Sequence, residues 1–157
     1  MAYIHNETFD IIQNSNAEDI LAGYFEVDDL LALPIQALNR KGYTTTFSCA
    51  GHAYETINEY DGELIKDNIN RFTDIVFADG VFLPNFPCGF FIKNQLPDGT
   101  MKYIWENEDG NVIDMPLGSI TLTKRYDSDM GIFEFLDEQL NAIKTLMALI
   151  NTLDFRK

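Results

Sequence analysis

The feature that most constrains the fold is a run of apolar residues near the C-terminus, spaced three and four positions apart. This spacing puts the apolar side chains on one face of an α-helix. The apolar positions are Ile132, Phe133, Leu136, Leu140, Ile143, Met147 and Ile150. Polar residues between Glu134 and Asn151 fall on the opposite face. The pattern predicts one amphipathic helix of about 23 residues, roughly 35 Å long, lying across an apolar surface.

A second well-marked unit begins near residue 29. Pro34 has the position of a first-turn proline and Gly42 that of a C-terminal stop signal, so a helix is expected between them. The β-branched and aromatic run of residues 43–47 follows directly. The sequence therefore predicts a helix, a glycine turn and a strand in succession.

Short β-prone runs occupy much of the remaining chain. Strands are expected at residues 3–12, 74–77, 81–83, 89–93 and 120–123, with a hairpin that joins residues 101–106 to 111–115 through Asp109-Gly110. Shorter helices are expected at residues 18–24 and 63–69. These elements predict an α+β fold, a mainly antiparallel sheet with helices on one face and the long C-terminal helix. Because linkers and repeats are absent, residues 1–157 are expected to form one globular domain.

The charge balance restricts the partners of the chain. It has 11 Lys and Arg residues against 25 Asp and Glu residues, a net charge of −14. Such a field repels phosphate backbones and anionic membrane surfaces, so direct nucleic-acid binding and membrane binding are not expected. Residues 1–39 contain seven carboxylates and no Lys or Arg. This acidic region favours a basic protein as a partner.

Targeting signals and cysteine content predict a compartment. The first residues lack the basic and apolar segments of a secretory signal, and no apolar run approaches the ~20 residues of a membrane span. The two cysteines are too few for a disulfide scaffold. We therefore expect a cytoplasmic protein with reduced thiols.

The residues with chemical potential are Ser48-Cys49-Ala50-Gly51-His52, expected on a tight turn after a strand. In one interpretation Cys49 is a catalytic nucleophile with His52 as its base. In another, the backbone N–H groups form a nest for an anionic or carbonyl group, with Ser48, Gly51 and His52 around the ligand. The two interpretations leave open whether the chain is an enzyme or a binding protein.

A metal site is the third interpretation of the same residues. Cys49 and His52 have the Cys-x-x-His spacing, and both side chains bind zinc when deprotonated. A closed structural site needs four ligands, so it would also use Cys88 and His5, or recruit a carboxylate such as Glu55. This interpretation predicts a structural zinc domain.

Arg40 and Lys41 form an isolated cationic pair shortly before this turn. Their charge predicts an anionic ligand. The main functional hypothesis is a small-molecule-binding protein or enzyme whose pocket is built around Ser48–His52, with Arg40 and Lys41 as further ligand-binding residues. The alternative is a non-enzymatic acidic interaction module, related to phage proteins and mimicking nucleic acid.

Residues 38–52, LNRKGYTTTFSCAGH, carry a resemblance. They resemble a segment of small uncharacterised bacterial and phage proteins of the form L-N-x-K-G-Y-x-T-x-x-S-C-S-G-H. More distantly, they are similar to the T-S-S-C-S-G-R segment of the tRNA wybutosine-synthesising methyltransferase family. That family transfers a methyl group from S-adenosylmethionine to a modified guanosine in tRNA.

The second resemblance implies that Ser48, Cys49 and Gly51 lie at a substrate or cofactor pocket. Two positions depart from the family pattern, because Ala50 replaces a serine and His52 replaces an arginine. The loss of that cation, together with the net charge of −14, argues against a tRNA substrate. The resemblance therefore supports the importance of the turn and not the methyl-transfer reaction.

Overall fold

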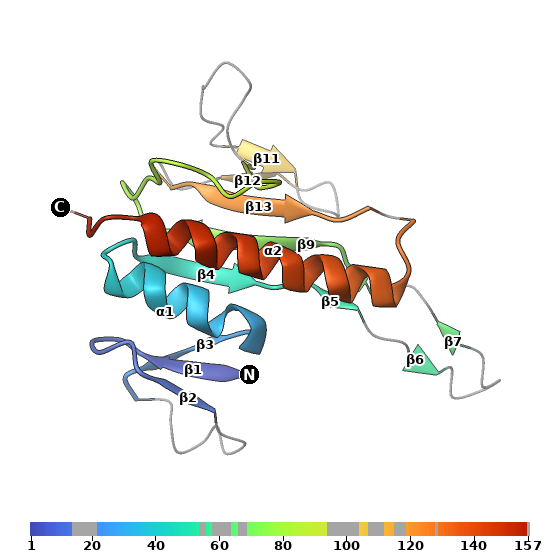
Figure 1. The fold of residues 1–157 in the computed structure, drawn as a ribbon, viewed down its shortest axis with the longest axis horizontal. Helices are drawn as coiled ribbons and strands as arrows, with labels where there is room; N and C mark the ends of the chain where they lie inside the picture. The colour runs from blue at the N-terminus through green and yellow to red at the C-terminus, as the bar shows by residue number, and fades with distance from the viewer. Residues whose placement is uncertain are drawn as a thin grey trace.

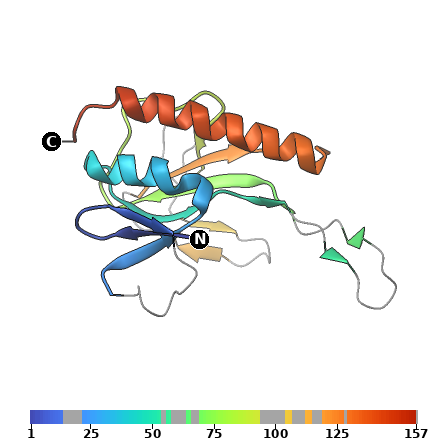
Figure 2. The same ribbon diagram turned by 60° about the horizontal axis from the view of Figure 1, so that its bottom comes forward.

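A computed structural model of the chain shows two antiparallel sheets with two helices side by side over one face of the larger sheet (Figure 1). It describes residues 1–13, 22–53, 56–57, 64–65, 69–93, 104–106, 112–114, 119–127 and 129–156. Figure 2 shows the helices and the sheets as separate layers. The expected α+β class is confirmed. Within the described ranges, no helix has the length and apolarity needed to cross a membrane.

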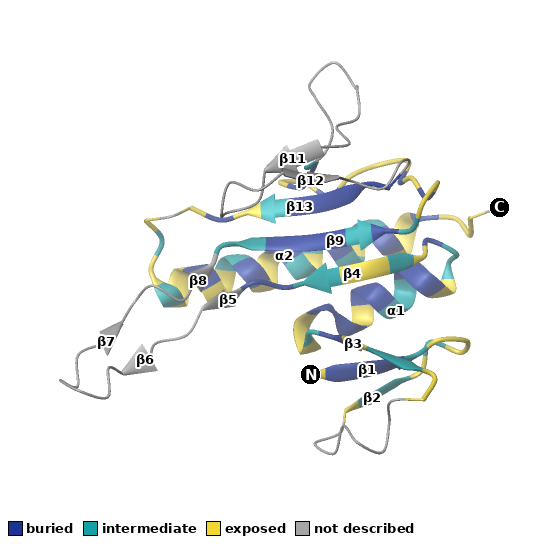
Figure 3. Ribbon diagram, turned by 180° about the vertical axis from the view of Figure 1, so that it is seen from behind, coloured by how far each residue is buried: buried dark blue, intermediate teal, exposed yellow. Residues whose placement is uncertain are grey.

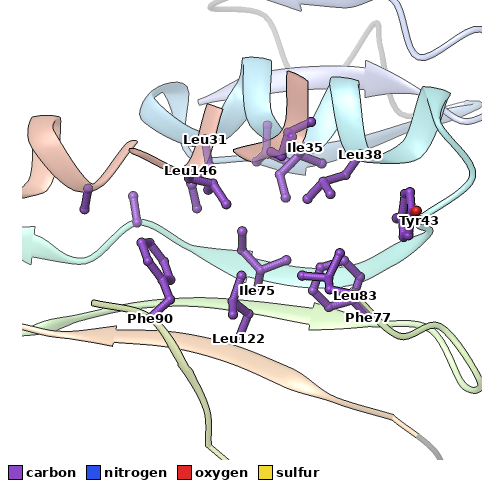
Figure 4. Packing of buried hydrophobic residues seen from close by; sticks show 14 of the residues in the cluster. Leu31, Ile35, Leu38, Tyr43, Ile75, Phe77, Leu83, Phe90, Leu122 and Leu146 are labelled. Carbon is purple, nitrogen blue, oxygen red and sulfur yellow. The ribbon is translucent and has the colours of Figure 1, made fainter. Parts of the chain in front are cut away.

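The larger sheet has the strand order β10-β13-β9-β4, and each neighbouring pair is antiparallel. The strands are β4 (Thr45–Cys49), β9 (Phe72–Phe77), β10 (Phe91–Ile92) and β13 (Thr121–Arg125). Ile75 of β9 lies opposite Leu122 of β13, and both are fully buried. Together with Phe77 they point toward the helices (Figure 4). This face of the sheet therefore forms one wall of the core.

The smaller sheet has the order β2-β1-β3, with β1 (Ala2–His5), β2 (Ile11–Gln13) and β3 (Tyr24–Val27). The single strand expected at residues 3–12 is wrong, because the chain turns back between β1 and β2. His5 stabilises the turn, since its Nδ1 atom accepts hydrogen bonds from the backbone N–H groups of Glu7 and Thr8, both at 3.1 Å. Phe9 adopts a positive φ of 60° there.

Short two-stranded antiparallel sheets complete the β structure of the described residues. β5 (His52–Ala53) pairs with β8 (Ile69–Asn70), β6 (Thr56–Ile57) with β7 (Leu64–Ile65), and β11 (Ile104–Glu106) with β12 (Val112–Asp114). The last pair confirms the expected hairpin, whose turn lies outside the described residues. The prediction of a helix at residues 63–69 is wrong, because residues 64–65 form β7 and residue 69 begins β8. In the expected helix 18–24, residues 18–21 lie outside the described residues and Tyr24 begins β3.

The helix, glycine turn and strand unit is confirmed. A short 3₁₀ helix, η2 (Asp29–Leu31), leads into α1 (Ala32–Arg40), and β4 follows. Gly42 ends the helix with a φ of +88°, which glycine adopts at little cost. The buried side chain of Asn39 donates hydrogen bonds to the carbonyl oxygen of Ile35 and to Oγ1 of Thr45, and its Oδ1 atom accepts one from the Thr45 N–H. Asn39 therefore sets the direction in which β4 leaves the turn.

The C-terminal helix α2 (Ile132–Thr152) is confirmed, but its buried face differs from the expected one. Its buried residues are Phe135, Gln139, Ala142, Leu146 and Ile150. Phe133, Leu136 and Leu140, which were expected in the core, are exposed. Compared with the expected orientation, the helix is rotated about its axis, so that the polar residue Gln139 faces inward. Its side chain forms hydrogen bonds with the carbonyls of Ala50 and Gly51.

Three hydrogen bonds attach the end of α2 to the unit around Gly42. The Nζ atom of Lys41 donates to the carbonyl oxygens of Ile150 at 2.8 Å and Leu153 at 2.7 Å. The hydroxyl of Tyr43 donates to the carbonyl oxygen of Asp154 at 3.1 Å. A cation at the C-terminal end of a helix also opposes the negative pole of its dipole. These contacts, which we call the Lys41–Tyr43 clasp, hold α2 against α1 and β4.

Candidate functional site

Of the residues expected on a tight turn, Ser48 and Cys49 end β4 and His52 begins β5, so the turn itself is Ala50-Gly51. This turn is held by hydrogen bonds from three separate parts of the chain. The N–H of Ala50 donates to the Asp28 carboxylate at 2.6 Å. The carbonyl of Ala50 accepts hydrogen bonds from Oγ1 of Thr73 at 2.7 Å and Nε2 of Gln139 at 2.6 Å. Nε2 of Gln139 also donates to the carbonyl of Gly51 at 2.9 Å. The backbone N–H of Ala50 was expected to bind an anionic or carbonyl group of a ligand. It binds the carboxylate of Asp28 in the same chain instead.

This turn continues into a buried polar network. The Thr73 hydroxyl lies 2.9 Å from the hydroxyl of Tyr126. Because Thr73 gives its single hydroxyl proton to Ala50, Tyr126 is the donor in this second bond. Burial raises the pKa of the Tyr126 hydroxyl. Gly51 adopts a φ of +88°, a conformation that suits glycine and lets both carbonyls point inward.

Cys49 is a half-buried thiol at the end of β4. The strand register places it opposite Asp74 of β9, and Asp74 opposite Thr123 of β13. Asp74 is 8% exposed; its carboxylate accepts a hydrogen bond of 2.8 Å from Thr123 and lies 3.8 Å from Nζ of Lys93. A nucleophilic cysteine normally has electropositive surroundings. Here the neighbour in the sheet is a carboxylate, which an ammonium group partly neutralises.

The structure separates the remaining predicted residues. His52 begins β5, where its backbone pairs with Asn70. The two other suggested metal ligands lie on different elements: His5 is in β1, and Cys88 is an exposed, free cysteine before β10. Glu55 lies outside the described residues. Among the described residues, no group of three or more His, Cys, Asp or Glu side chains could hold a metal ion.

Arg40 and Lys41 have partners inside the chain. A nitrogen of the Arg40 guanidinium lies 2.9 Å from the Asp10 carboxylate, and its Nε donates to the carbonyl of Thr8. Lys41 belongs to the Lys41–Tyr43 clasp. The cations on which the expectation of an anionic ligand depends are therefore directed toward the turn between β1 and β2 and toward the end of α2.

A pocket lies between the edges of the two sheets. We call it the β3–β4 pocket; its volume is about 640 Å³, and it is lined by Met1, Asn6, Phe9, Asn39 and residues 25–27 and 44–48. Ser48 is the predicted site residue within this lining. Seen from behind, β9 is largely buried whereas the middle of β4 is exposed (Figure 3). The pocket therefore lies along β4, the strand that leads into the turn at Ala50-Gly51.

The lining combines aromatic rings with small polar groups. Phe9, Phe25 and Phe47 supply the rings, and Phe47 is 61% exposed. Among the described lining residues, Glu26 carries the only charged side chain. Sequence reasoning missed these four residues, because they come from three segments far apart in the chain: the turn between β1 and β2, β3, and β4. The available signal was Phe47, a large apolar residue beside Ser48.

Comparison of the chain with protein-family models, with curated proteins and with solved structures finds no match. The two resemblances of residues 38–52 therefore stay predictions. The geometry nevertheless explains several residues of that segment. Asn39, Lys41, Gly42 and Tyr43 each join α1 to β4 or to the end of α2.

Proposed function

We propose that the chain is a small-molecule-binding protein whose ligand occupies the β3–β4 pocket. The observation that carries this proposal is the pocket itself, whose volume of about 640 Å³ falls within the roughly 300–1,000 Å³ of ligand sites. Such sites combine apolar walls with a few polar groups. The β3–β4 pocket has both, and it includes Ser48, which the sequence marks for ligand binding.

The lining defines the chemistry of the ligand. Phe9, Phe25 and Phe47 suit a flat apolar group, while Asn6, Thr44 and Ser48 offer amide and hydroxyl groups for hydrogen bonds. Glu26 adds a negative charge at one side. Since Arg40 and Lys41 lie elsewhere, we propose a neutral or cationic aromatic ligand in place of the anionic one expected from the sequence.

A fragment screen by ligand-observed NMR tests this proposal. The library contains aromatic fragments in three sets, which are cationic, neutral and anionic. We expect hits from the cationic and neutral sets, and Glu26→Gln should weaken the cationic hits selectively because it removes the charge and keeps the shape. A preference for anionic fragments that survives E26Q would contradict the ligand class.

Two matched pairs of variants locate the binding. Thr46→Trp should block the pocket, because Thr46 is exposed at its wall, whereas Thr152→Trp places the same side chain at the exposed C-terminal end of α2, outside the lining. Phe47→Ala should weaken binding, and Phe82→Ala, at another exposed phenylalanine, should not. Fragments that bind T46W and F47A as tightly as the parent would place the ligand outside the β3–β4 pocket. The absence of any hit in the parent would overturn the function.

A catalytic role of Cys49 is the second interpretation of the same segment, and it stays a prediction. Iodoacetamide labelling followed by mass spectrometry tests it, with the exposed Cys88 as the internal reference. A catalytic Cys49 should react faster than Cys88, because thiolates are the reactive species. The carboxylate of Asp74 across the sheet leads us to expect slower labelling of Cys49.

A further inference from the structure

Three exposed apolar side chains on α2 form a continuous stripe. Phe133, Leu136 and Leu140 are 85%, 39% and 46% exposed. Their spacing of three and four residues places them on one face of the helix, and the half-buried Ile143 and Met147 continue the same spacing. We call Phe133, Leu136 and Leu140 the α2 stripe. The core uses the adjoining face, with Phe135, Leu146 and Ile150, and Ile143 and Met147 pack against its margin.

The neighbouring helical segment also has exposed leucines. Leu33 of α1 is 62% exposed and Leu30 of η2 is 38% exposed. Figure 1 shows α1 beside α2. Single exposed apolar residues are common on protein surfaces, but a stripe at heptad spacing has the pattern with which one helix packs against another.

The charges beside the stripe indicate what covers it. Glu134 and Asp137 are exposed between the apolar positions, and Asp127 and Asp129 are exposed just before the helix. Cations near this end of α2 include Lys124 and Arg125, which precede Asp127, and Arg71, whose guanidinium donates to the carbonyls of Asp127 and Met130. On α2 itself the N-terminal half carries carboxylates, at Glu134, Asp137 and Glu138, and the first cation is Lys144.

We propose that the α2 stripe docks a basic amphipathic helix of another protein. The apolar face of the docked helix covers Phe133, Leu136 and Leu140, and the Lys or Arg residues of the docked helix contact Glu134 and Asp137. Helix-in-groove recognition uses apolar anchors at this spacing, and opposite charges at the rim set the orientation. A second copy of the chain is the weaker candidate, because it brings like carboxylates together and carries the same net charge of −14.

The test uses the full chain and a synthetic helical peptide of about 20 residues, with Leu at the heptad a and d positions and Lys at the others. A peptide of the same composition with shuffled order is the first control. Fluorescence anisotropy measures the affinity of the chain for each of the two peptides. We expect the patterned peptide to bind at least about tenfold more tightly than the shuffled one, and its affinity to fall as NaCl rises from about 50 mM to about 500 mM.

Surface variants then locate the binding. Leu136→Gln with Leu140→Gln should weaken binding about tenfold, and so should Glu134→Gln with Asp137→Gln. Phe82→Gln and Asp79→Asn are the matched controls, because both residues are exposed in the segment after β9. Circular dichroism checks that each variant keeps the helix content and melting temperature of the parent.

Two results would overturn the proposal. Binding that L136Q/L140Q leaves unchanged would show that the peptide docks elsewhere on the acidic surface. Light scattering that finds a dimer of the parent chain, and a monomer of L136Q/L140Q, would make a second copy the occupant. Thr46→Trp should leave peptide binding intact, so a failure here is distinguishable from a failure of the small-molecule proposal.

Discussion

Gln139 and Ala50 are joined by a hydrogen bond of 2.6 Å, from Nε2 of the glutamine to the carbonyl oxygen of the alanine, across 89 positions of the chain. The same nitrogen donates to the carbonyl of Gly51 at 2.9 Å. A buried polar side chain in the middle of α2 is therefore the link between the long helix and the turn after β4. Its loss would remove one donor from each of these two carbonyl groups.

Gln139→Leu should lower the free energy of unfolding by about 1–3 kcal/mol, the usual result of leaving a buried acceptor unsatisfied. Thr73 still donates to the Ala50 carbonyl in this variant, so the Gly51 carbonyl is the group most affected. Urea denaturation measures the change. Asn141→Leu is the matched control, since residue 141 is exposed on the same helix. An equal loss in both variants would contradict the role of Gln139.

Gly42 and Gly80 form a natural pair for testing the Lys41–Tyr43 clasp. Both have a positive φ, so alanine at either position should lower stability by about 1 kcal/mol through backbone strain. A Cβ atom on Gly42 would lie 3.2 Å from Cβ of Arg156, whereas nothing lies within 4 Å of one on Gly80. Gly42→Ala should therefore cost more than Gly80→Ala in urea denaturation. Equal losses would show that the segment around Arg156 shifts freely.

Tyr126 should make stability fall in alkaline solution. Burial raises the pKa of its hydroxyl above the ordinary value of 10.0, so the tyrosine of the unfolded chain ionises first. The contribution of Tyr126 to the free energy of unfolding is complete below a pH of about 10. It is lost as the pH rises through the pKa of the tyrosine in the folded state. Urea denaturation between about pH 9 and about pH 11 should therefore show a shallower decline for Tyr126→Phe.

Part of the alkaline decline should remain in Y126F. The pKa of Tyr3 is also raised, first by burial and then by the carboxylate of Glu26, which lies opposite it in the strand register. Absorbance of the phenolate follows both groups during a pH titration. Identical slopes of stability against pH in the parent and in Y126F would contradict the assignment to Tyr126.

Local signals predicted the elements that the chain encodes locally. Pro34 and Gly42 marked the ends of α1, because a proline in the first turn and a glycine after the last turn act through their own backbones. Residues 101–115 predicted a hairpin for a similar reason, and β11 pairs with β12. The turn between β1 and β2 was missed because the His5 ring, together with backbone hydrogen bonds between His5, Phe9 and Asp10, holds it, and a strand pattern does not reveal these contacts.

The periodicity of the sequence alone could not identify which face of α2 is buried. The helix carries two overlapping apolar stripes, and the one that contains Phe133 and Leu140 is unbroken in sequence. The stripe that is actually buried includes Gln139, whose partners lie at Ala50 and Gly51. Only the tertiary contact shows that a polar residue belongs inside.

The candidate pocket was predictable only in part. Ser48 was recognised from its segment, whereas Phe9, Phe25 and Glu26 became neighbours of Ser48 through the approach of two sheets. Likewise, Arg40 and Lys41 read as free cations in the sequence, although their partners are Asp10 and the end of α2. Local composition cannot separate a cation that binds a ligand from one that holds the fold.

The Lys41–Tyr43 clasp has a consequence for how the chain reaches this fold. Its hydrogen bonds connect residues 109 to 112 positions apart, so the loop that must close is most of the polypeptide. Contacts of such separation slow folding, because chain entropy is lost before the contacts form. During synthesis, α1 and β4 emerge long before the helix that covers their sheet. The nascent sheet therefore keeps an apolar face uncovered until Leu153 leaves the ribosome, a period in which a chaperone has its best opportunity to bind.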